Sequence, residues 1–173
     1  MKALFSFLTK TPQTRVSFIA VNSLKLDESG NLFCALVAGV NDHLLCGRGW
    51  HERALDGRFG FLYRPTGREA EFALNLPAGT GEITALICAS ATLCGVLRGE
   101  LFCEKKSLGE FALDSENWVL RRFPLPPAPA GLRRFCWIIK NPFIPNDYLR
   151  NGDFREMGVH VASVRFDSSK KEK

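Results

Sequence analysis

The chain has 173 residues, of which 46% are hydrophobic and 24% charged, and its formal net charge is +5. A chain of this length can bury a core without help from disulfides or metals, and its balance of apolar and charged residues argues against a disordered or membrane-spanning protein. Glycine (15), proline (9) and phenylalanine (14) are frequent, while there are only three tryptophans and two tyrosines. Such a composition favours many short strands joined by turns.

The N-terminal segment and the cysteines indicate the compartment. The apolar run at residues 3–8 stops at Lys10, which is too short for a secretory signal, and no apolar stretch of about 18 residues follows. We therefore expect a cytoplasmic protein that does not insert into a membrane. The cysteines, whose neighbours are largely apolar, are at positions 34, 46, 88, 94, 103 and 136. They lack zinc-ligand spacing and are expected to be small core residues, with a disulfide framework as the alternative in a secreted chain.

Segments typical of β-strands follow one another along the chain, separated by turn residues. They are residues 16–21, 32–37, 58–64, 70–76, 82–89, 94–98, 101–104, 110–113, 118–124, 132–140 and 158–166. Phe72, Leu74 and Leu76 fall on one face of their run, and this alternation marks a half-buried antiparallel strand. Residues 145–156 favour a short helix or helical turn, and the proline-rich residues 126–131 favour an exposed loop or a sheet edge.

This pattern predicts an all-β fold, a two-sheet antiparallel β-sandwich of the jelly-roll kind with about nine to eleven strands. Trp118 and Trp137 lie in strand-like runs and are expected in its core. Because no linker divides the chain, we assign residues 1–166 to a single domain and the polar residues 167–173 to a flexible charged tail. An immunoglobulin-like sandwich stays open, since periodicity does not determine strand order.

The familiar motifs of catalysis are missing from the sequence. There is neither a G-x-S-x-G nucleophile elbow nor a G-x-x-x-x-G-K-[ST] phosphate loop. Residues 79–81 begin like a dinucleotide-binding turn but lead into a strand, and we predict a hairpin turn there. The three histidines, His43, His51 and His160, are scattered singly. We therefore predict neither a metal nor another cofactor, and no enzymatic activity.

The positive net charge raises the question of nucleic-acid binding. Basic residues occur as doublets at 105–106, 121–122 and 133–134 and in the C-terminal tail. Along a strand, the two members of a doublet point to opposite faces, so a doublet does not build a phosphate-binding track. No aromatic RNA-recognition motif accompanies them. A solvated surface is the better interpretation, and we expect no nucleic-acid partner.

Two segments carry more polar and aromatic residues than a sandwich requires. The first comprises Gly49-Trp50-His51-Glu52 and then Asp56-Gly57-Arg58-Phe59, and the second is Asp153-Phe154-Arg155-Glu156-Met157-Gly158 before the last strand. Asp153 can accept backbone N–H bonds in its turn, while Arg155 can reach a second carboxylate, for which Glu52 is the candidate. One interpretation is structural: a buried Glu52–Arg155 pair would fix the loop entering the last strand to the loop after Cys46.

These segments resemble a galactose-binding-like β-sandwich module associated with bacterial glycosyltransferases and surface-polysaccharide proteins. The resemblance spans roughly residues 45–166 and is carried by Gly49, Trp50, Glu52, Gly57, Arg58, Phe59, Leu76-Pro77, Trp118, Leu125-Pro126, Pro142, Asp153, Arg155, Met157, Gly158 and Val159. It implies a jelly roll with a non-catalytic role near glycans, whose partner is a glycan or a glycosyltransferase.

The functional interpretation of the same residues is a carbohydrate site. Trp50 would offer its ring to the apolar face of a sugar, and Glu52, Arg58, Asp153 and Arg155 would hydrogen-bond the hydroxyls. The leading hypothesis is therefore a carbohydrate-binding or glycan-enzyme accessory module. A protein-interaction sandwich without a sugar site and a jelly-roll enzyme of unknown substrate are the alternatives. The oligomeric state does not follow from the sequence.

Overall fold

The computed structural model describes residues 35–168. The predicted strand at 16–21, the start of the run at 32–37, Cys34 and most of the predicted tail lie outside the described residues. The ten strands of the described part are β1 (Ala35–Val37), β2 (Ala54–Asp56), β3 (Phe61–Pro65), β4 (Glu69–Leu76), β5 (Gly79–Cys88), β6 (Leu97–Cys103), β7 (Lys106–Leu113), β8 (Val119–Ala128), β9 (Gly131–Ile139) and β10 (His160–Ser168). The short helices are α1 (Asp42–Leu45), α2 (Ala91–Cys94) and α3 (Pro145–Leu149).

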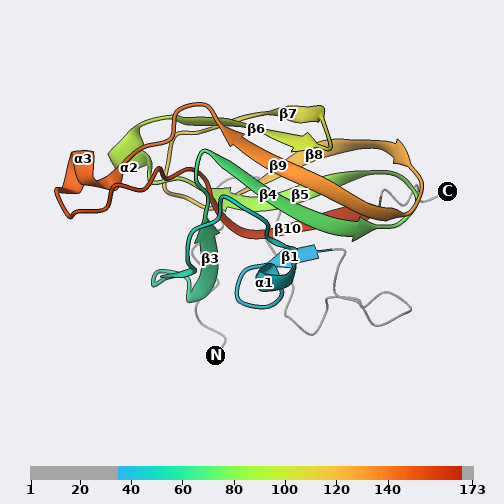
Figure 1. Ribbon diagram of the computed structural model, residues 1–173, viewed down its shortest axis with the longest axis horizontal. Coiled ribbons are helices and arrows are strands. Elements are labelled where there is room, and N and C mark those ends of the chain that lie inside the picture. The colour runs from blue at the N-terminus through green and yellow to red at the C-terminus, as the bar shows by residue number, and fades with distance from the viewer. Residues whose placement is uncertain (1–34, 169–173) are drawn as a thin grey trace, which may run out of the picture.

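The strands form two antiparallel sheets that pack face to face (Figure 1). One sheet has the order β2-β3-β10-β5-β8, with β1 also pairing with β10, and the other has the order β4-β9-β6-β7. This confirms the predicted two-sheet antiparallel β-sandwich. The loop that carries α3 projects from one end of the sandwich (Figure 1).

The pairing is that of a jelly roll, in which one long hairpin is rolled up. β6 pairs with β7, β5 with β8, β4 with β9 and β3 with β10, so each pair encloses the one before it. Rolling the hairpin adds the pairings of β5 with β10 and of β6 with β9. Most connections therefore cross from one sheet to the other, which excludes the immunoglobulin-like alternative.

Alternating side chains build the core between the sheets. Phe72, Leu74 and Leu76 of β4 all face inward, as their spacing predicts. Trp137 of β9 is fully buried, and its ring packs edge to face with those of Phe111 and Phe123 at centroid separations of 5.5 and 5.7 Å. The core is thus rich in rings, and part of the excess of phenylalanine in the sequence lies there.

Several strand boundaries differ from the sequence-based expectation. The run at 58–64 is interrupted, because Phe59 and Gly60 donate their N–H groups to the Asp56 carbonyl and close a turn before β3 begins. Residues 79–81 do not form a hairpin turn: they open β5 with a bulge, and the preceding connection crosses from one sheet to the other. The runs at 94–98 and 101–104 contribute to a single strand, β6.

Of the two structures expected for the proline-rich residues 126–131, an exposed loop or a sheet edge, the structure shows the sheet edge. β8 continues through Pro126 and Pro127 to Ala128, and it lies at the edge of the six-stranded sheet. Proline is tolerated there because an edge strand does not need every N–H for pairing. The helical turn expected within 145–156 is α3, and β10 includes the first two residues of the predicted tail, 167 and 168.

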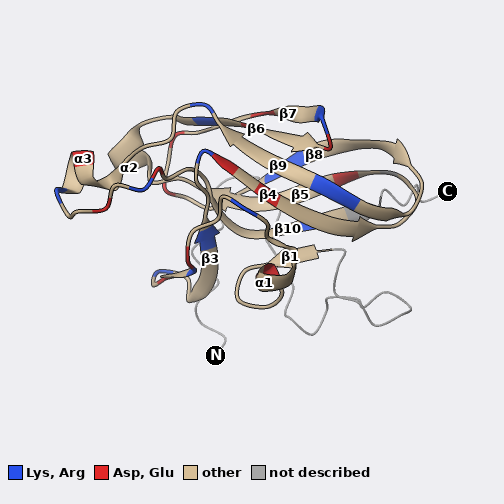
Figure 2. Cartoon of the chain, viewed as in Figure 1, with Lys and Arg blue, Asp and Glu red and all other residues tan. Residues whose placement is uncertain are grey.

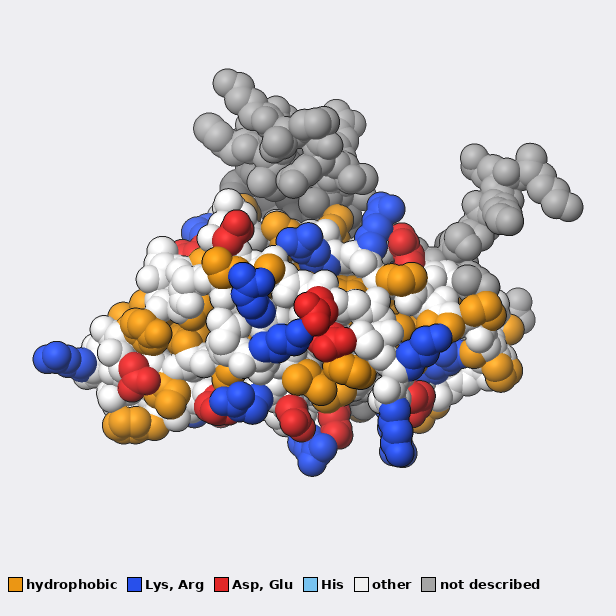
Figure 3. All heavy atoms as spheres, turned by 90° about the horizontal axis from the view of Figure 1, so that it is seen from above, with side chains coloured by type: hydrophobic (Ala, Val, Ile, Leu, Met, Phe, Trp, Pro, Cys, Tyr) orange, Lys and Arg blue, Asp and Glu red, His pale blue; other side chains and the backbone are white. Residues whose placement is uncertain are grey.

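Charge is dispersed over the described surface. Basic and acidic segments are scattered along the chain (Figure 2), and on the face in Figure 3 charged side chains of both signs are mixed with apolar ones. Cys46, Cys88, Cys94, Cys103 and Cys136 are free thiols, all at least partly buried. Within residues 35–168 no helix has the length and apolar character needed to cross a membrane.

Candidate functional site

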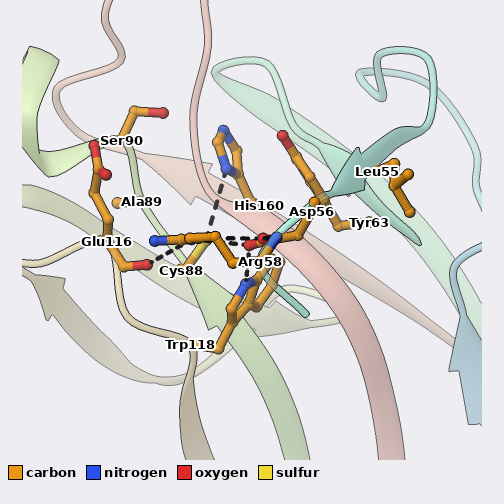
Figure 4. Close-up of a pocket in the computed structure, with 11 residues that line it drawn as sticks. Leu55, Asp56, Arg58, Tyr63, Cys88, Ala89, Ser90, Glu116, Trp118 and His160 are labelled. Carbon is orange, nitrogen blue, oxygen red and sulfur yellow. Dashed lines mark hydrogen bonds and ion pairs between the residues drawn. The ribbon is translucent and has the colours of Figure 1, made fainter. Parts of the chain in front are cut away.

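A pocket of about 380 Å³ opens at one end of the six-stranded sheet. It lies where β2 and the following turn, the end of β5, the loop before β8 and the start of β10 come together around β3. Its polar and aromatic lining residues are Asp56, Arg58, Tyr63, Ser90, Glu116, Trp118 and His160. Figure 4 shows that these side chains converge from strands and loops far apart in the sequence.

The carboxylate of Asp56 holds two other pocket side chains in place. Its carboxylate accepts hydrogen bonds from Arg58 Nε (3.2 Å), Arg58 Nη2 (2.8 Å), the Arg58 backbone N–H (2.9 Å) and Trp118 Nε1 (2.7 Å) (Figure 4). The bonds from Arg58 and Trp118 hold the pKa of Asp56 well below its usual range despite burial, so the carboxyl is ionised. The guanidinium of Arg58 and the indole of Trp118 are thereby fixed.

Aromatic rings form one side of the pocket. The Tyr63 and Trp118 rings meet edge to face with centroids 5.5 Å apart, and Tyr63 stacks on His160 at 4.8 Å. The Phe61 ring also meets the Trp118 ring edge to face, with centroids 4.9 Å apart. Trp118 is therefore half-buried at a pocket and does not belong to the central core, where its strand-like run had placed it. Trp137, in contrast, lies in the core as expected.

His160 and Cys88 are both uncharged at neutral pH. Burial lowers the pKa of His160 to about 4 and raises the pKa of the Cys88 thiol to about 12. The Cys88 sulfur lies 3.7 Å from His160 Nδ1. These two residues contribute a neutral imidazole and a protonated thiol to the pocket.

Other polar groups stand at the pocket with capacity to bind a ligand. Glu116 Oε1 accepts a hydrogen bond from the Thr92 hydroxyl of α2, and the Glu116 carbonyl accepts one from Arg58 Nη2 at 3.1 Å. Within residues 35–168, Arg58 Nη1 and the hydroxyls of Tyr63 and Ser90 donate no hydrogen bond to protein. A bound molecule could therefore use these donors without breaking a bond within the protein.

The structure places one of the five predicted site residues, Arg58, at the pocket. Trp50 lies elsewhere, half-buried against the core, where its indole N–H donates to the Glu71 carbonyl at 2.6 Å and its ring meets the edge of Phe72. Glu52 is exposed, with no ion pair within residues 35–168. The ligand-binding role of these outlying residues stays a prediction.

Asp153 and Arg155 bind each other outside the pocket. Arg155 donates from Nε to Asp153 Oδ1 (2.8 Å) and from Nη2 to Asp153 Oδ2 (2.6 Å), and these bonds lower the pKa of Asp153 to about 2. Arg155 therefore pairs with a carboxylate of its own turn, and the expected buried pair with Glu52 does not form. The local pair is favoured because two residues that are two apart in a turn lose little conformational entropy when they bind each other.

The two distinctive segments nevertheless lie side by side, as the structural interpretation requires. His51 Nε2 lies 2.8 Å from the Glu156 carbonyl, and the residues between β3 and β4 bridge both segments. The N–H of Gly67 donates to the Gly49 carbonyl, and that of Gly158 donates to the Thr66 carbonyl, each at 2.7 Å. Backbone hydrogen bonds therefore connect the two segments, and an ion pair between Arg68 Nη2 and Glu156 Oε1 (2.8 Å) contributes in place of the expected Glu52–Arg155 pair.

Sequence reasoning missed most of the pocket. Tyr63, Ser90 and His160 were not proposed as ligand-binding residues, and Trp118 was placed in the core. Each comes from a different strand or loop, so no spacing along the chain connects them. The one available signal was the pairing of Asp56 with Arg58, because an acidic and a basic residue two apart in a turn can bind each other.

Comparison with known proteins gives structural neighbours only. No family model and no curated protein sequence matches this chain. A family 36 carbohydrate-binding module in complex with calcium and xylotriose is similar, with a TM-score of 0.47, 10% identity and coverage of 77% of this chain and 98% of that one. A family 35 module from an environmental isolate has a TM-score of 0.46, 12% identity and coverage of 72% and 93%. A family 6 module of Cellvibrio mixtus lichenase 5A in complex with cellotriose has a TM-score of 0.46, 14% identity and coverage of 79% and 98%.

The chain's own strand pairing defines its class. It is a jelly-roll β-sandwich, with two antiparallel sheets wound from nested pairs of strands. At one end of the six-stranded sheet it carries a pocket whose walls combine two aromatic rings with fixed polar groups.

Proposed function

We propose that the chain is a non-catalytic carbohydrate-binding module whose sugar occupies the pocket between Arg58, Tyr63 and Trp118. The observation that carries the proposal is the pairing of aromatic rings with planar polar groups in one cavity. A sugar ring has an apolar face that stacks on aromatic side chains, and hydroxyls that pair with amide, carboxylate and guanidinium groups. The pocket volume of about 380 Å³ lies within the usual range for small-molecule sites.

The chemistry of the lining supports binding more than catalysis. A nucleophilic cysteine must be a thiolate, whereas the pKa of Cys88 is raised to about 12. Among the described residues, Glu116 is the only lining carboxylate with an oxygen that accepts no hydrogen bond. The pocket therefore lacks an available pair of carboxylates for acid–base catalysis, because the carboxylate of Asp56 accepts four hydrogen bonds from Arg58 and Trp118. These groups serve to hold the pocket in shape, which is what a binding site requires.

Calorimetric titration with a panel of oligosaccharides tests the proposal. The variant Tyr63→Leu removes an aromatic wall and keeps an apolar side chain, so we expect it to weaken sugar binding by at least about tenfold. Tyr148→Leu is the matched control, because Tyr148 is an exposed residue of α3 outside the pocket. Absence of binding by every sugar, or equal affinities in the two variants, would contradict the proposal.

The same titration tests the predicted residues outside the pocket. Arg155 binds Asp153 at the protein surface, so Arg155→Ala removes the exposed guanidinium without opening the core. If these residues contact the sugar as the sequence predicts, affinity falls in this variant. Unchanged affinity restricts the sugar to the pocket.

A docking role for another protein, such as a glycosyltransferase, is the second candidate. It is favoured by three large apolar side chains that are mostly exposed on the projecting loop around α3: Tyr148, Leu149 and Phe154. Such residues on a soluble protein commonly mark a contact surface. On this alternative, the double variant L149S/F154S loses association with the protein partner and keeps the sugar affinity of the wild type.

A further inference from the structure

The charges that line the pocket do not cancel. Asp56 and Arg58 neutralise each other through two side-chain bonds of 2.8 and 3.2 Å. The carboxylate of Glu116 has no cationic partner within 4 Å among the described residues. The lining therefore carries one more negative than positive charge, and His160 is uncharged at neutral pH.

Glu116 is held in a defined position. The hydroxyl of Thr92, in α2, donates to Glu116 Oε1, and the backbone carbonyl of Glu116 accepts the Arg58 guanidinium. Glu116 Oε2 makes no hydrogen bond within residues 35–168. Figure 4 shows the Glu116 side chain beside Arg58 at the pocket wall. A fixed carboxylate oxygen without a partner is a ready acceptor for a charged donor.

The aromatic rings of the pocket also favour a positively charged ligand. The faces of tyrosine and tryptophan rings carry partial negative charge and attract cations. Tyr63 and Trp118 line the same pocket as Glu116. An acidic ligand would meet the carboxylates of Glu116 and Asp56, while the charge of Arg58 is already paired with Asp56 and only its Nη1 makes no hydrogen bond within residues 35–168, so net repulsion would oppose its binding.

From this charge balance we infer that the pocket prefers a saccharide carrying a free amino group, with Glu116 as the partner of its ammonium. The inference rests on the proposed function and adds the ligand class. It assigns Glu116 the role of a specificity-determining residue, while Tyr63 and Trp118 contact the ring of any sugar that binds.

Four forms of one sugar backbone test the preference. β-1,4-linked trimers of glucosamine, N-acetylglucosamine, glucose and glucuronic acid are titrated against the wild type at neutral pH. We expect the glucosamine trimer to bind at least about fivefold more tightly than the acetylated and the neutral trimers, and the acidic trimer to bind most weakly. Glu116→Gln keeps the bond from Thr92 and removes the charge, so it abolishes the preference for the glucosamine trimer over the glucose trimer.

A second variant controls for the overall charge of the protein. Glu69→Gln makes the same change in net charge on β4, where Glu69 is exposed on the other sheet and outside the pocket. It must retain the preference for glucosamine. Equal or tighter binding of the neutral or acidic trimer, or a preference that survives Glu116→Gln, overturns the inference and leaves the proposed function standing. If none of the four trimers binds while other sugars do, the inference is likewise overturned and the proposed function stands. If no sugar of the whole panel binds, both proposals are overturned.

Discussion

Asp56 shows how one buried carboxylate can organise a binding site. It lies at the end of β2, is 7% exposed, and receives bonds from a guanidinium, an indole and a backbone N–H. Its backbone carbonyl accepts the N–H of Gly60 and closes the turn that contains Arg58, so Asp56 fixes both the backbone and the side chain of Arg58. The geometry of the pocket therefore depends on a residue that offers no free lone pair to a ligand.

Replacing this carboxylate by an amide tests its organising role. Asp56→Asn loses the ion pair and some of the acceptor bonds, so we expect the free energy of unfolding to fall by about 2 kcal/mol. Urea unfolding of the variant measures this change. A matched substitution, Asp153→Asn, affects a more exposed carboxylate that binds Arg155, and should cost less than about 1 kcal/mol. Similar losses in the two variants would contradict the role given to Asp56.

His160 makes the stability of the fold depend on pH. Its pKa is lowered by burial from 6.5 to about 4, so the unfolded chain binds its proton more readily than the folded protein does. The folded state is therefore fully stabilised above about pH 6.5, and the free energy of unfolding falls by roughly 3 kcal/mol as the pH drops towards 4.

Urea unfolding between pH 4 and 7 measures this slope, and His160→Phe should flatten it, because phenylalanine keeps a ring against Tyr63 and does not titrate. Asp56 and Asp153, whose pKa values are lowered, lose their contributions at lower pH than this window. A slope unchanged in His160→Phe would assign the pH dependence to another group.

At the scale of elements, close backbone packing explains why glycine occupies positions 49 and 158 in the two distinctive segments. Gly49 has a φ of +83°, and a Cβ there would lie 1.7 Å from the Glu69 carbonyl oxygen. A Cβ at Gly158 would lie 2.5 Å from Thr66 Oγ1. Gly49 thus lets its loop pass close to the start of β4, and Gly158 lets its own segment pass close to the connection between β3 and β4. Glycine at these two positions is therefore explained by packing and needs no binding function.

This close approach makes Gly49→Ala a severe substitution. The backbone conformation and the collision with Glu69 together should lower the free energy of unfolding by at least about 2 kcal/mol. Gly57→Ala is the control, because a Cβ at Gly57 meets no atom within 4 Å, and we expect a change below about 0.5 kcal/mol. Thermal unfolding of both variants checks the prediction, and equal melting temperatures would contradict it.

The elements also show what local sequence could reveal. The inward spacing of Phe72, Leu74 and Leu76 predicted β4 because a strand's faces alternate with period two. The run at 58–64 was misplaced because its apolar alternation continues through a turn that the Asp56 carbonyl closes. Trp118 was assigned to the core because it lies within the strand-like run at 118–124, whereas β8 begins one residue later, at Val119.

At the scale of the molecule, the two-sheet fold was predictable and the pocket was not. Composition, alternation and turn residues are local, and they determine that strands form and pack in two layers. The pocket depends on which strand ends meet, and that is decided by the rolled-up hairpin, whose pairs join residues as distant as Val161 and Arg64. The proposed association with glycosyltransferases and the cytoplasmic location stay predictions.

Strand position in the sheets predicts a pattern of hydrogen exchange. β10 pairs with β5 along one edge and with β3 and β1 along the other, whereas β2 and β8 are edge strands. We expect the amides of β10 and β5 to exchange slowest and those of β2 fastest, because central amides open only when the sheet unfolds. Exchange measured by mass spectrometry that is as fast in β10 as in β2 would contradict this arrangement.

The central position of β10 bears on how the protein is made. Residues 160–168 leave the ribosome after every other strand described here, yet they join β5 to β3. Until then the growing chain exposes the unpaired edges of both strands, which can pair with other chains. Completion of the sheet, and with it the wall of the pocket that His160 supplies, must wait for the last strand. We therefore expect chaperones to bind the nascent chain mainly before β10 emerges.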